Sequence, residues 1–226
     1  MNCVVQDNVR IGKRCEIGNN VVIHCGTVIG DEVYVGDNAV LGRKPRSGPT
    51  SIRKTDEQAP LVIGDRVVIG TSAVIYAGTK IKDDAMVADL AAVREGCLIG
   101  EGARIGRCVT VECNTMVGKG SVVQTGTHLT GDMIVEDQVF IGPEVCTAND
   151  KYMSRRLDVI LKGPVIRKGA SVGANATLLP GVEIGPEAVV GAGAVVIKDV
   201  PAGEVVVGNP AVALRRSNDI KDHPEG

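Results

Sequence analysis

The 226 residues carry a net charge of −2 with both signs mixed along the chain, which excludes the basic surface typical of a nucleic-acid-binding protein. There is no apolar run of about 18 residues and no charged-then-apolar start, so we expect no membrane span, no secretory signal and a cytoplasmic location. Apolar residues make up 44% of the chain but aromatic residues only 2%, so the core must consist of Val, Ile, Leu and Ala.

Aliphatic residues recur every six positions in three blocks. The blocks run from Val5 to Leu41, from Ile63 to Ile141 and from Ile166 to Val196. Four residues after most of these aliphatics stands a small or β-branched residue. An α-helix needs a period near 3.6 and a strand a period of 2, so a period of six fits neither. It predicts a chain that turns a corner every six residues and stacks on itself, as a single domain over 1–226.

Two long segments interrupt the repeat and are predicted to be loops, at 42–60 and 147–165. The first contains three Pro and five basic residues and has no apolar rhythm. It is either a solvated excursion or a flap over a groove, because long loops on a rigid scaffold often carry function. The segment 212–226 is predicted to be a polar tail, with a short helix at 212–216.

The six-residue motif resembles that of the hexapeptide-repeat acyltransferases, in which an aliphatic residue and Gly are followed, after two variable positions, by a small residue. Ile63-Gly64, Ile99-Gly100 and Ile105-Gly106 are examples. The resemblance implies an all-β fold, a left-handed parallel β-helix of triangular section, with about nine coils here. It also implies a homotrimer with active sites between subunits.

With three faces per coil, residues 18 apart should stack in columns. In one column the position after the aliphatic residue lacks the usual Gly and holds Tyr76, Arg94, Glu112 and Thr130. This column is either a weak ion pair that ties coils together or one side of a substrate groove. His128 stands 18 residues before Cys146, so it should lie beside the start of the second loop, where it serves either a structural or a catalytic role.

The segment from Ile141 to Asp150 is similar to the IGPxVxxTND segment of sugar-nucleotide N-acetyltransferases. The resemblance implies that Asn149 and Asp150 lie near the amine to be acetylated, on a dTDP- or UDP-linked deoxysugar. The alternative is an Asx turn that opens the loop. Arg155 and Arg156 are candidates for the pyrophosphate of such a substrate, or are solvated loop charges.

The segment from Gly169 to Ala211 resembles the acetyl-CoA-binding end of the same family. It implies contacts to the pantetheine arm, the phosphates and the adenine from these candidates: Ala174, Ala176, Ala192, Ala194, Lys168, Lys198, Arg215, Asn209 and Pro210. No metal is expected, because the seven Cys lack paired CxxC spacing and the three His are about a hundred residues apart.

The sequence therefore predicts an acetyl-CoA-dependent N-acetyltransferase for a nucleotide-linked amino sugar. An O-acetyltransferase for a sugar or serine hydroxyl is the first alternative, and it would depend on His128 as general base. A non-catalytic β-helix scaffold is the second, and acetyl-CoA should not stabilise it. A γ-type carbonic anhydrase would need three zinc-binding His, two of them close in sequence, which this chain lacks.

Overall fold

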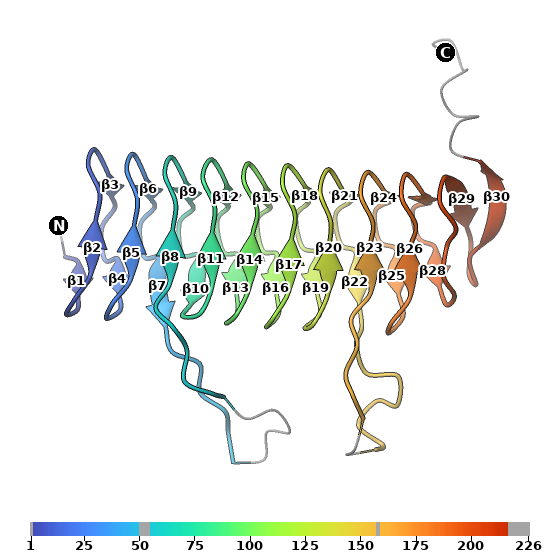
Figure 1. The fold of residues 1–226 in the computed structure, drawn as a ribbon, viewed down its shortest axis with the longest axis horizontal. Helices are drawn as coiled ribbons and strands as arrows, with labels where there is room; N and C mark the ends of the chain where they lie inside the picture. The colour runs from blue at the N-terminus through green and yellow to red at the C-terminus, as the bar shows by residue number, and fades with distance from the viewer. Residues whose placement is uncertain (1, 50–54, 157–158, 217–226) are drawn as a thin grey trace, which may run out of the picture.

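The protein is represented by a computed structural model that describes residues 2–49, 55–156 and 159–216. In these residues the chain forms strands β1 to β30 and no α-helix, and hence no helix that could cross a membrane. The strands form three sheets, which are the three faces of a left-handed parallel β-helix (Figure 1). The predicted fold class is confirmed.

Each sheet contains every third strand in chain order. The first sheet has ten strands: β1 (Val4–Val5), β4 (Val22–Ile23), β7 (Val40–Arg43), β10 (Val74–Tyr76), β13 (Ala92–Val93), β16 (Thr110–Val111), β19 (His128–Leu129), β22 (Cys146–Thr147), β25 (Thr177–Leu178) and β28 (Val195–Val196). The second has nine: β2 (Arg10–Ile11), β5 (Val28–Ile29), β8 (Val62–Ile63), β11 (Lys80–Ile81), β14 (Leu98–Ile99), β17 (Met116–Val117), β20 (Ile134–Val135), β23 (Val165–Ile166) and β26 (Glu183–Ile184). The third has eleven: β3 (Glu16–Ile17), β6 (Tyr34–Val35), β9 (Val68–Ile69), β12 (Met86–Val87), β15 (Arg104–Ile105), β18 (Val122–Val123), β21 (Phe140–Ile141), β24 (Ser171–Val172), β27 (Val189–Val190), β29 (Glu204–Val207) and β30 (Val212–Arg216).

The six-residue period follows from how each short strand meets its corner. The second residue of a strand, such as Ile99 or Ile105, points inward and is fully buried. Three residues later the backbone adopts a positive φ, as at Gly102 (63°) and Cys108 (56°), and this bends the chain onto the next face. The residue after that is small because it fills the inside of the corner. Ala103, for example, is fully buried there.

Some corners use Thr or Ser in the small inward position, and their hydroxyl groups are satisfied by backbone carbonyls. Thr115 donates to the carbonyl oxygen of Thr130 over 2.9 Å, and Thr127 donates to that of Gly142 over 2.9 Å. Buried hydroxyls of this kind stabilise the stack, because a buried polar group without a partner would be costly.

Adjacent coils pair in parallel with a constant register. Val93 lies opposite Val111, and Val111 lies opposite Leu129. The amide of Arg94 donates to the carbonyl of Val111 over 2.8 Å, and the amide of Glu112 donates to that of Leu129 over 2.8 Å. Residues 18 apart therefore lie in columns, as predicted.

Both long connections leave the first sheet, one after β7 and one after β22. They project from the same side of the solenoid (Figure 1). We call the connection 44–61 the first loop and the connection 148–164 the second loop; the positions 50–54 and 157–158 within them lie outside the described residues. Strands β10, β13, β16 and β19 separate β7 from β22 in the sheet, so four coils lie between the loops.

Two details of the prediction are wrong. The segment 212–216 is strand β30, not a helix, and it pairs antiparallel with β29 after a turn at 208–211. This pairing uses backbone groups that β29 would otherwise present at the end of its sheet, so it is preferred over local helix formation. The sheets of ten, nine and eleven strands also make the solenoid one to two coils longer than the nine expected.

Candidate active site

The corner between the first and second sheets is open, whereas the other corners are closed by the neighbouring coil. A Cβ atom added to Gly100, at a closed corner, would lie 2.6 Å from backbone atoms of Gly118 and Lys119. At the corner between the first and second sheets the equivalent position carries a side chain on consecutive coils, at Tyr76, Arg94, Glu112 and Thr130. We call this corner the open edge.

We expect a Gly→Ala substitution to cost more stability at a closed corner than beside the open edge. We expect Gly100→Ala to lower the free energy of unfolding by about 1–3 kcal/mol, because the added methyl group overpacks the corner. Gly131→Ala, beside the open edge, should lower it less, by about 1 kcal/mol, because the nearest atom to the new methyl group is the carbonyl oxygen of Cys113 at 3.2 Å, which must shift only slightly. Chemical denaturation of both variants measures the difference. Equal losses would show that the open edge is not more open than the other corners.

Arg94, Glu112 and Thr130 stack on consecutive coils of the open edge, as the column predicted. Arg94 Nη1 lies 3.5 Å from Glu112 Oε2. The guanidinium of Arg94 also lies over the ring of Tyr76, with 5.1 Å between Cζ and the ring centroid. The column is therefore a set of contacting side chains, and not only a register of backbone positions.

Glu95 holds Arg94 in place, and the sequence analysis did not single it out. Its carboxylate accepts two hydrogen bonds from Arg94, at 2.8 Å from Nε and 3.0 Å from Nη2. The residue is only 6% exposed. The hydrogen bond with Glu95 is the main reason that the pKa of Arg94 is raised above its ordinary value. This partly buried bidentate pair fixes the direction in which the guanidinium points.

A cavity of about 420 Å³ lies over the open edge between the two loops. The solenoid forms its floor, the first loop contributes Arg46, Ser47 and Thr55, and the second loop contributes Asn149 and Leu161. The floor residues are Arg94, Glu95, Glu112, Cys113, His128, Thr130 and Gly131. The sequence identified four of these floor residues and Asn149, but no sequence signal placed the other loop residues, because segments without a repeat have no register.

His128 faces this cavity from β19 and is half-buried. Its Nδ1 lies 2.7 Å from the hydroxyl oxygen of Thr110, its register partner on β16. This hydrogen bond fixes the plane of the imidazole ring. When Nδ1 carries the proton and Thr110 accepts it, Nε2 has a lone pair that can accept a proton from a substrate. The predicted position next to Cys146 is also confirmed, since the two residues pair between β19 and β22.

Asn149 and Asp150 have different surroundings. The side-chain amide of Asn149 lines the cavity and donates to the carbonyl oxygen of Gly131 over 3.1 Å. The Asp150 carboxylate instead accepts backbone N–H bonds from Tyr152 (2.8 Å) and Ser154 (2.6 Å). These bonds, first that of Ser154, lower the pKa of Asp150. Asp150 is not among the described residues that line the cavity; its carboxylate closes the Asx-type turn, and its catalytic role stays a prediction.

Arg155 and Arg156 are exposed on the second loop and are not among the described residues that line the cavity. The guanidinium of Arg156 lies over the ring of Tyr152, with 4.5 Å between Cζ and the ring centroid. Their predicted contact with a substrate pyrophosphate has no geometric support within one protomer.

The residues predicted to bind CoA lie at more than one corner of the solenoid. Ala176 and Ala194 are 0% exposed, because they are the small inward residues of their hexads; the prediction that they contact a ligand is wrong. Ala174 and Ala192 stack at the corner between the third and first sheets, whereas Lys168 and Lys198 follow strands of the second and first sheets. Asn209 and Pro210 are exposed in the turn before β30. Arg215 lies in β30, but its side chain lies outside the described part of the structure.

Comparison with known sequences places the chain among repeat proteins of one type. Residues 8–43 and 163–198 match the family described as bacterial transferase hexapeptide (six repeats). Residues 60–88 match the hexapeptide repeat of succinyl-transferase. The chain therefore contains hexapeptide repeats of these two kinds. The matched segments contain strands β2 to β7, β8 to β12 and β23 to β28, and the coils from β13 to β22 lie between them.

Relatives of this hexapeptide-repeat protein include the bifunctional protein GlmU of Carboxydothermus hydrogenoformans. It is 33% identical over 204 residues, which are 90% of this chain but 41% of GlmU. The chain thus spans about two fifths of the length of this relative.

Two solved structures share the fold. The UDP-N-acetylglucosamine acyltransferase of Arabidopsis superposes with a TM-score of 0.63 at 16% identity, over 96% of this chain and 74% of that protein. PerB of Caulobacter crescentus, solved with CoA and GDP-perosamine, has a TM-score of 0.50 at 18% identity, over 84% and 86% of the two chains. At these identities the likeness shows the fold alone.

Proposed function

We propose that this protein is an acyl-CoA-dependent N-acetyltransferase that acts on the amino group of a nucleotide-linked amino sugar. The observation that carries the proposal is the cavity between the loops, where His128, Asn149, Arg94 and Glu112 converge. The family match supports acyl transfer, and the Caulobacter relative, solved with CoA and GDP-perosamine, supports a nucleotide-linked sugar as acceptor.

His128 is the general base of the proposed reaction. The neutral amine attacks the thioester carbonyl of acetyl-CoA, and Nε2 of His128 takes the proton that the nitrogen loses as the C–N bond forms. When the tetrahedral intermediate collapses, the C–S bond breaks and the proton passes from His128 to the CoA thiolate. A base within hydrogen-bond reach of the amine contributes about 10²–10⁴-fold to such a step.

The neighbouring side chains hold the acceptor. The amide of Asn149 is positioned to bind the amine or an adjacent hydroxyl group, because it lines the same cavity and is oriented by Gly131. On the neighbouring coils of the cavity floor, Arg94 offers a hydrogen-bond donor and Glu112 offers an acceptor to the hydroxyl groups of the sugar. Asp150 is a positioning residue in this proposal. The turn that its carboxylate stabilises sets the direction of the second loop directly after Asn149.

The sites for CoA and the assembly stay proposals that depend on family likeness. We place the pantetheine arm against Ala174 and Ala192, which are the accessible members of the predicted set. A homotrimer, predicted from the same likeness, is checked by light scattering in solution. The cytoplasmic location is likewise a prediction.

A direct assay tests the proposed function. The purified protein is incubated with acetyl-CoA and a set of dTDP-, UDP- and GDP-linked amino sugars, and the release of the CoA thiol is followed. We expect saturable acetylation of at least one nucleotide-linked amine. The matched hydroxyl sugar in place of each amine separates N- from O-transfer. Acetylation of the hydroxyl sugar alone would replace the N-acetyl assignment by O-acetyl transfer, and no stabilisation by acetyl-CoA would favour a scaffold.

A further inference from the structure

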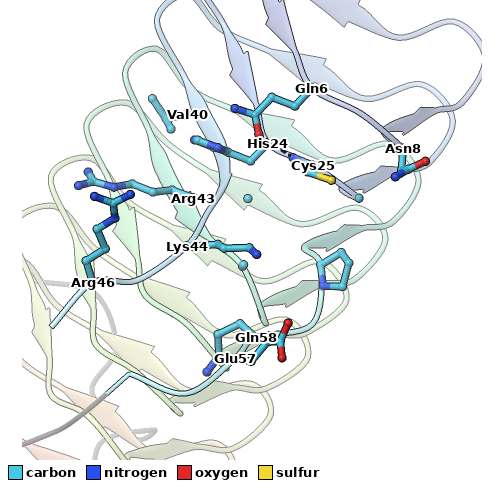
Figure 2. Close-up of a pocket in the computed structure, with 14 residues that line it drawn as sticks. Gln6, Asn8, His24, Cys25, Val40, Arg43, Lys44, Arg46, Glu57 and Gln58 are labelled. Atoms are coloured by element: carbon cyan, nitrogen blue, oxygen red, sulfur yellow. Dashed lines mark hydrogen bonds between the residues drawn. The ribbon is translucent and has the colours of Figure 1, made fainter.

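A second cavity, larger than the first, lies beneath the first loop on the side away from the second loop. Its volume is about 940 Å³, within the usual range of small-molecule sites. The lining residues come from the open edge of the first coils and from both arms of the loop. They are Gln6, Asn8, His24, Cys25, Gly26, Val40, Gly42, Arg43, Lys44, Arg46, Glu57, Gln58, Pro60 and Ala77. Figure 2 shows Arg43, Lys44 and Arg46 on one arm and Glu57 and Gln58 on the other.

Hydrogen bonds fix the walls of this cavity. Both arms of the loop bind the same corner, since the amide of Ala77 donates to the carbonyl of Arg43 (2.9 Å) and that of Gly78 donates to Ala59 (2.6 Å). The returning arm also packs closely on Gly26, where an added Cβ would lie 2.9 Å from Cγ of Pro60. A site held in this way is preorganised and loses little conformational freedom when a ligand binds.

The charge of the lining is positive, although the whole chain is slightly acidic. Arg43, Lys44 and Arg46 outnumber the one carboxylate, Glu57. His24 adds no positive charge near neutral pH, because burial, and then the charge of Arg43, lower its pKa. The amides of Gln6, Asn8 and Gln58 add neutral donors and acceptors. Clustered basic groups beside neutral amides suit a ligand that has both phosphates and a polar ring.

The two cavities lie along the same open edge, with the second cavity closer to the N-terminal coils. Arg46 lines both cavities. The ring of Tyr76 contacts the guanidinium of Arg43, which lines the second cavity, and that of Arg94, which lines the first; the distances from Cζ to the ring centroid are 5.6 and 5.1 Å. From β7 to β19 there are four coil steps of about 4.8 Å, or roughly 19 Å. Only an extended ligand could reach from His128 into the second cavity.

We propose that this second cavity binds the nucleoside diphosphate part of the substrate, with its phosphates at Arg43, Lys44 and Arg46. The proposal rests on the function proposed above, and it specifies how that substrate lies along the open edge. The sugar occupies the cavity between the loops, the phosphates pass Arg46 and Tyr76, and the base lies among Gln6, Asn8 and Gln58.

The test uses Lys44→Ala, because the Lys44 side chain is exposed and lines the second cavity without belonging to the catalytic cavity. Binding of UDP, dTDP and GDP is measured by calorimetry. Turnover is measured with acetyl-CoA and the accepted nucleotide-linked amino sugar. We expect the Kd of the nucleoside diphosphate that binds, and the KM of the sugar nucleotide, to rise at least tenfold. The kcat and the KM for acetyl-CoA should stay within twofold. Lys151→Ala, an exposed lysine of the second loop, is the matched control and should change none of these values.

Cys25 supplies an independent readout, since it is exposed and lines the second cavity. We expect the bound nucleoside diphosphate to slow its alkylation by N-ethylmaleimide. Cys108, also exposed but not among the lining residues, should react at an unchanged rate. Mass spectrometry of the peptides separates the two thiols.

Two results would overturn the inference while leaving acetyl transfer intact. One is a sugar nucleotide that is acetylated equally well by the wild type and by Lys44→Ala. The other is a wild type that acetylates the free amino sugar as well as its nucleotide-linked form and binds none of the three nucleoside diphosphates. Conversely, Lys44-dependent binding and protection of Cys25 without any acetylation would support the nucleotide site and overturn the proposed reaction.

Discussion

His128→Ala is expected to lower kcat by about 10²–10⁴-fold, because the variant lacks the group that accepts the proton of the attacking amine. The fold should survive, since the half-buried ring lies on the outer face of β19 and not in the core. Steady-state kinetics with saturating acetyl-CoA measure the loss, and the thermal midpoint of unfolding checks the fold. The KM for the acceptor should change much less than kcat, because His128 acts mainly in the transition state.

Two matched variants show whether the effect belongs to the imidazole. Thr110→Val removes the partner of Nδ1 and should lower kcat about tenfold, since the ring loses its fixed plane but keeps its base. Asp150→Asn should also lose less than tenfold, because an amide oxygen can still accept one of the two turn hydrogen bonds. If Asp150→Asn were as inactive as His128→Ala, the roles assigned to the two residues would be wrong.

Arg94→Ala is expected to have the second largest effect, on both stability and substrate binding. The carboxylate of Glu95 would stay buried without the two hydrogen bonds from Arg94, which costs several kcal/mol when a pair is fully buried. Because the Arg94 side chain is 33% exposed, we expect a smaller loss of about 2 kcal/mol in the free energy of unfolding. The KM for the acceptor should rise about tenfold, as for the loss of a hydrogen bond to a charged group.

The double variant Arg94→Ala/Glu95→Gln separates these two effects. Replacing the stranded carboxylate with a neutral amide should recover most of the stability, which a denaturant titration measures. The KM for the acceptor should stay high, because Arg94 is still missing from the cavity. Recovery of both would show that Arg94 only holds the edge together and makes no contact with the substrate.

Much of the fold could be predicted because the repeat constrains it at every coil. The aliphatic residue, the positive-φ corner and the small inward residue each have a local physical cause, so the column of Arg94, Glu112 and Thr130 could be derived by counting. The position of His128 beside Cys146 followed from the same count. The open edge could be inferred from the lack of Gly at Tyr76, Arg94, Glu112 and Thr130, although the cavity that lies over it is visible only in three dimensions.

The wrong predictions concern positions where the repeat gives no information, or where the repeat was not applied. The short helix at 212–216 was wrong because pairing with β29 depends on a chain reversal that has no period. Ala176 and Ala194 were assigned to a ligand, although counting their hexads would have placed them inside. Arg46, Ser47 and Thr55 were missed because the path of the first loop over the open edge is set by tertiary contacts.

A crystal structure of the protein with CoA and its accepted nucleotide-linked amino sugar is the most direct test of the catalytic cavity. We predict the sugar amine within hydrogen-bond distance of Nε2 of His128 and of the Asn149 side chain, between the two loops. A sugar bound on another face of the solenoid, away from Arg94 and Glu112, would contradict the account.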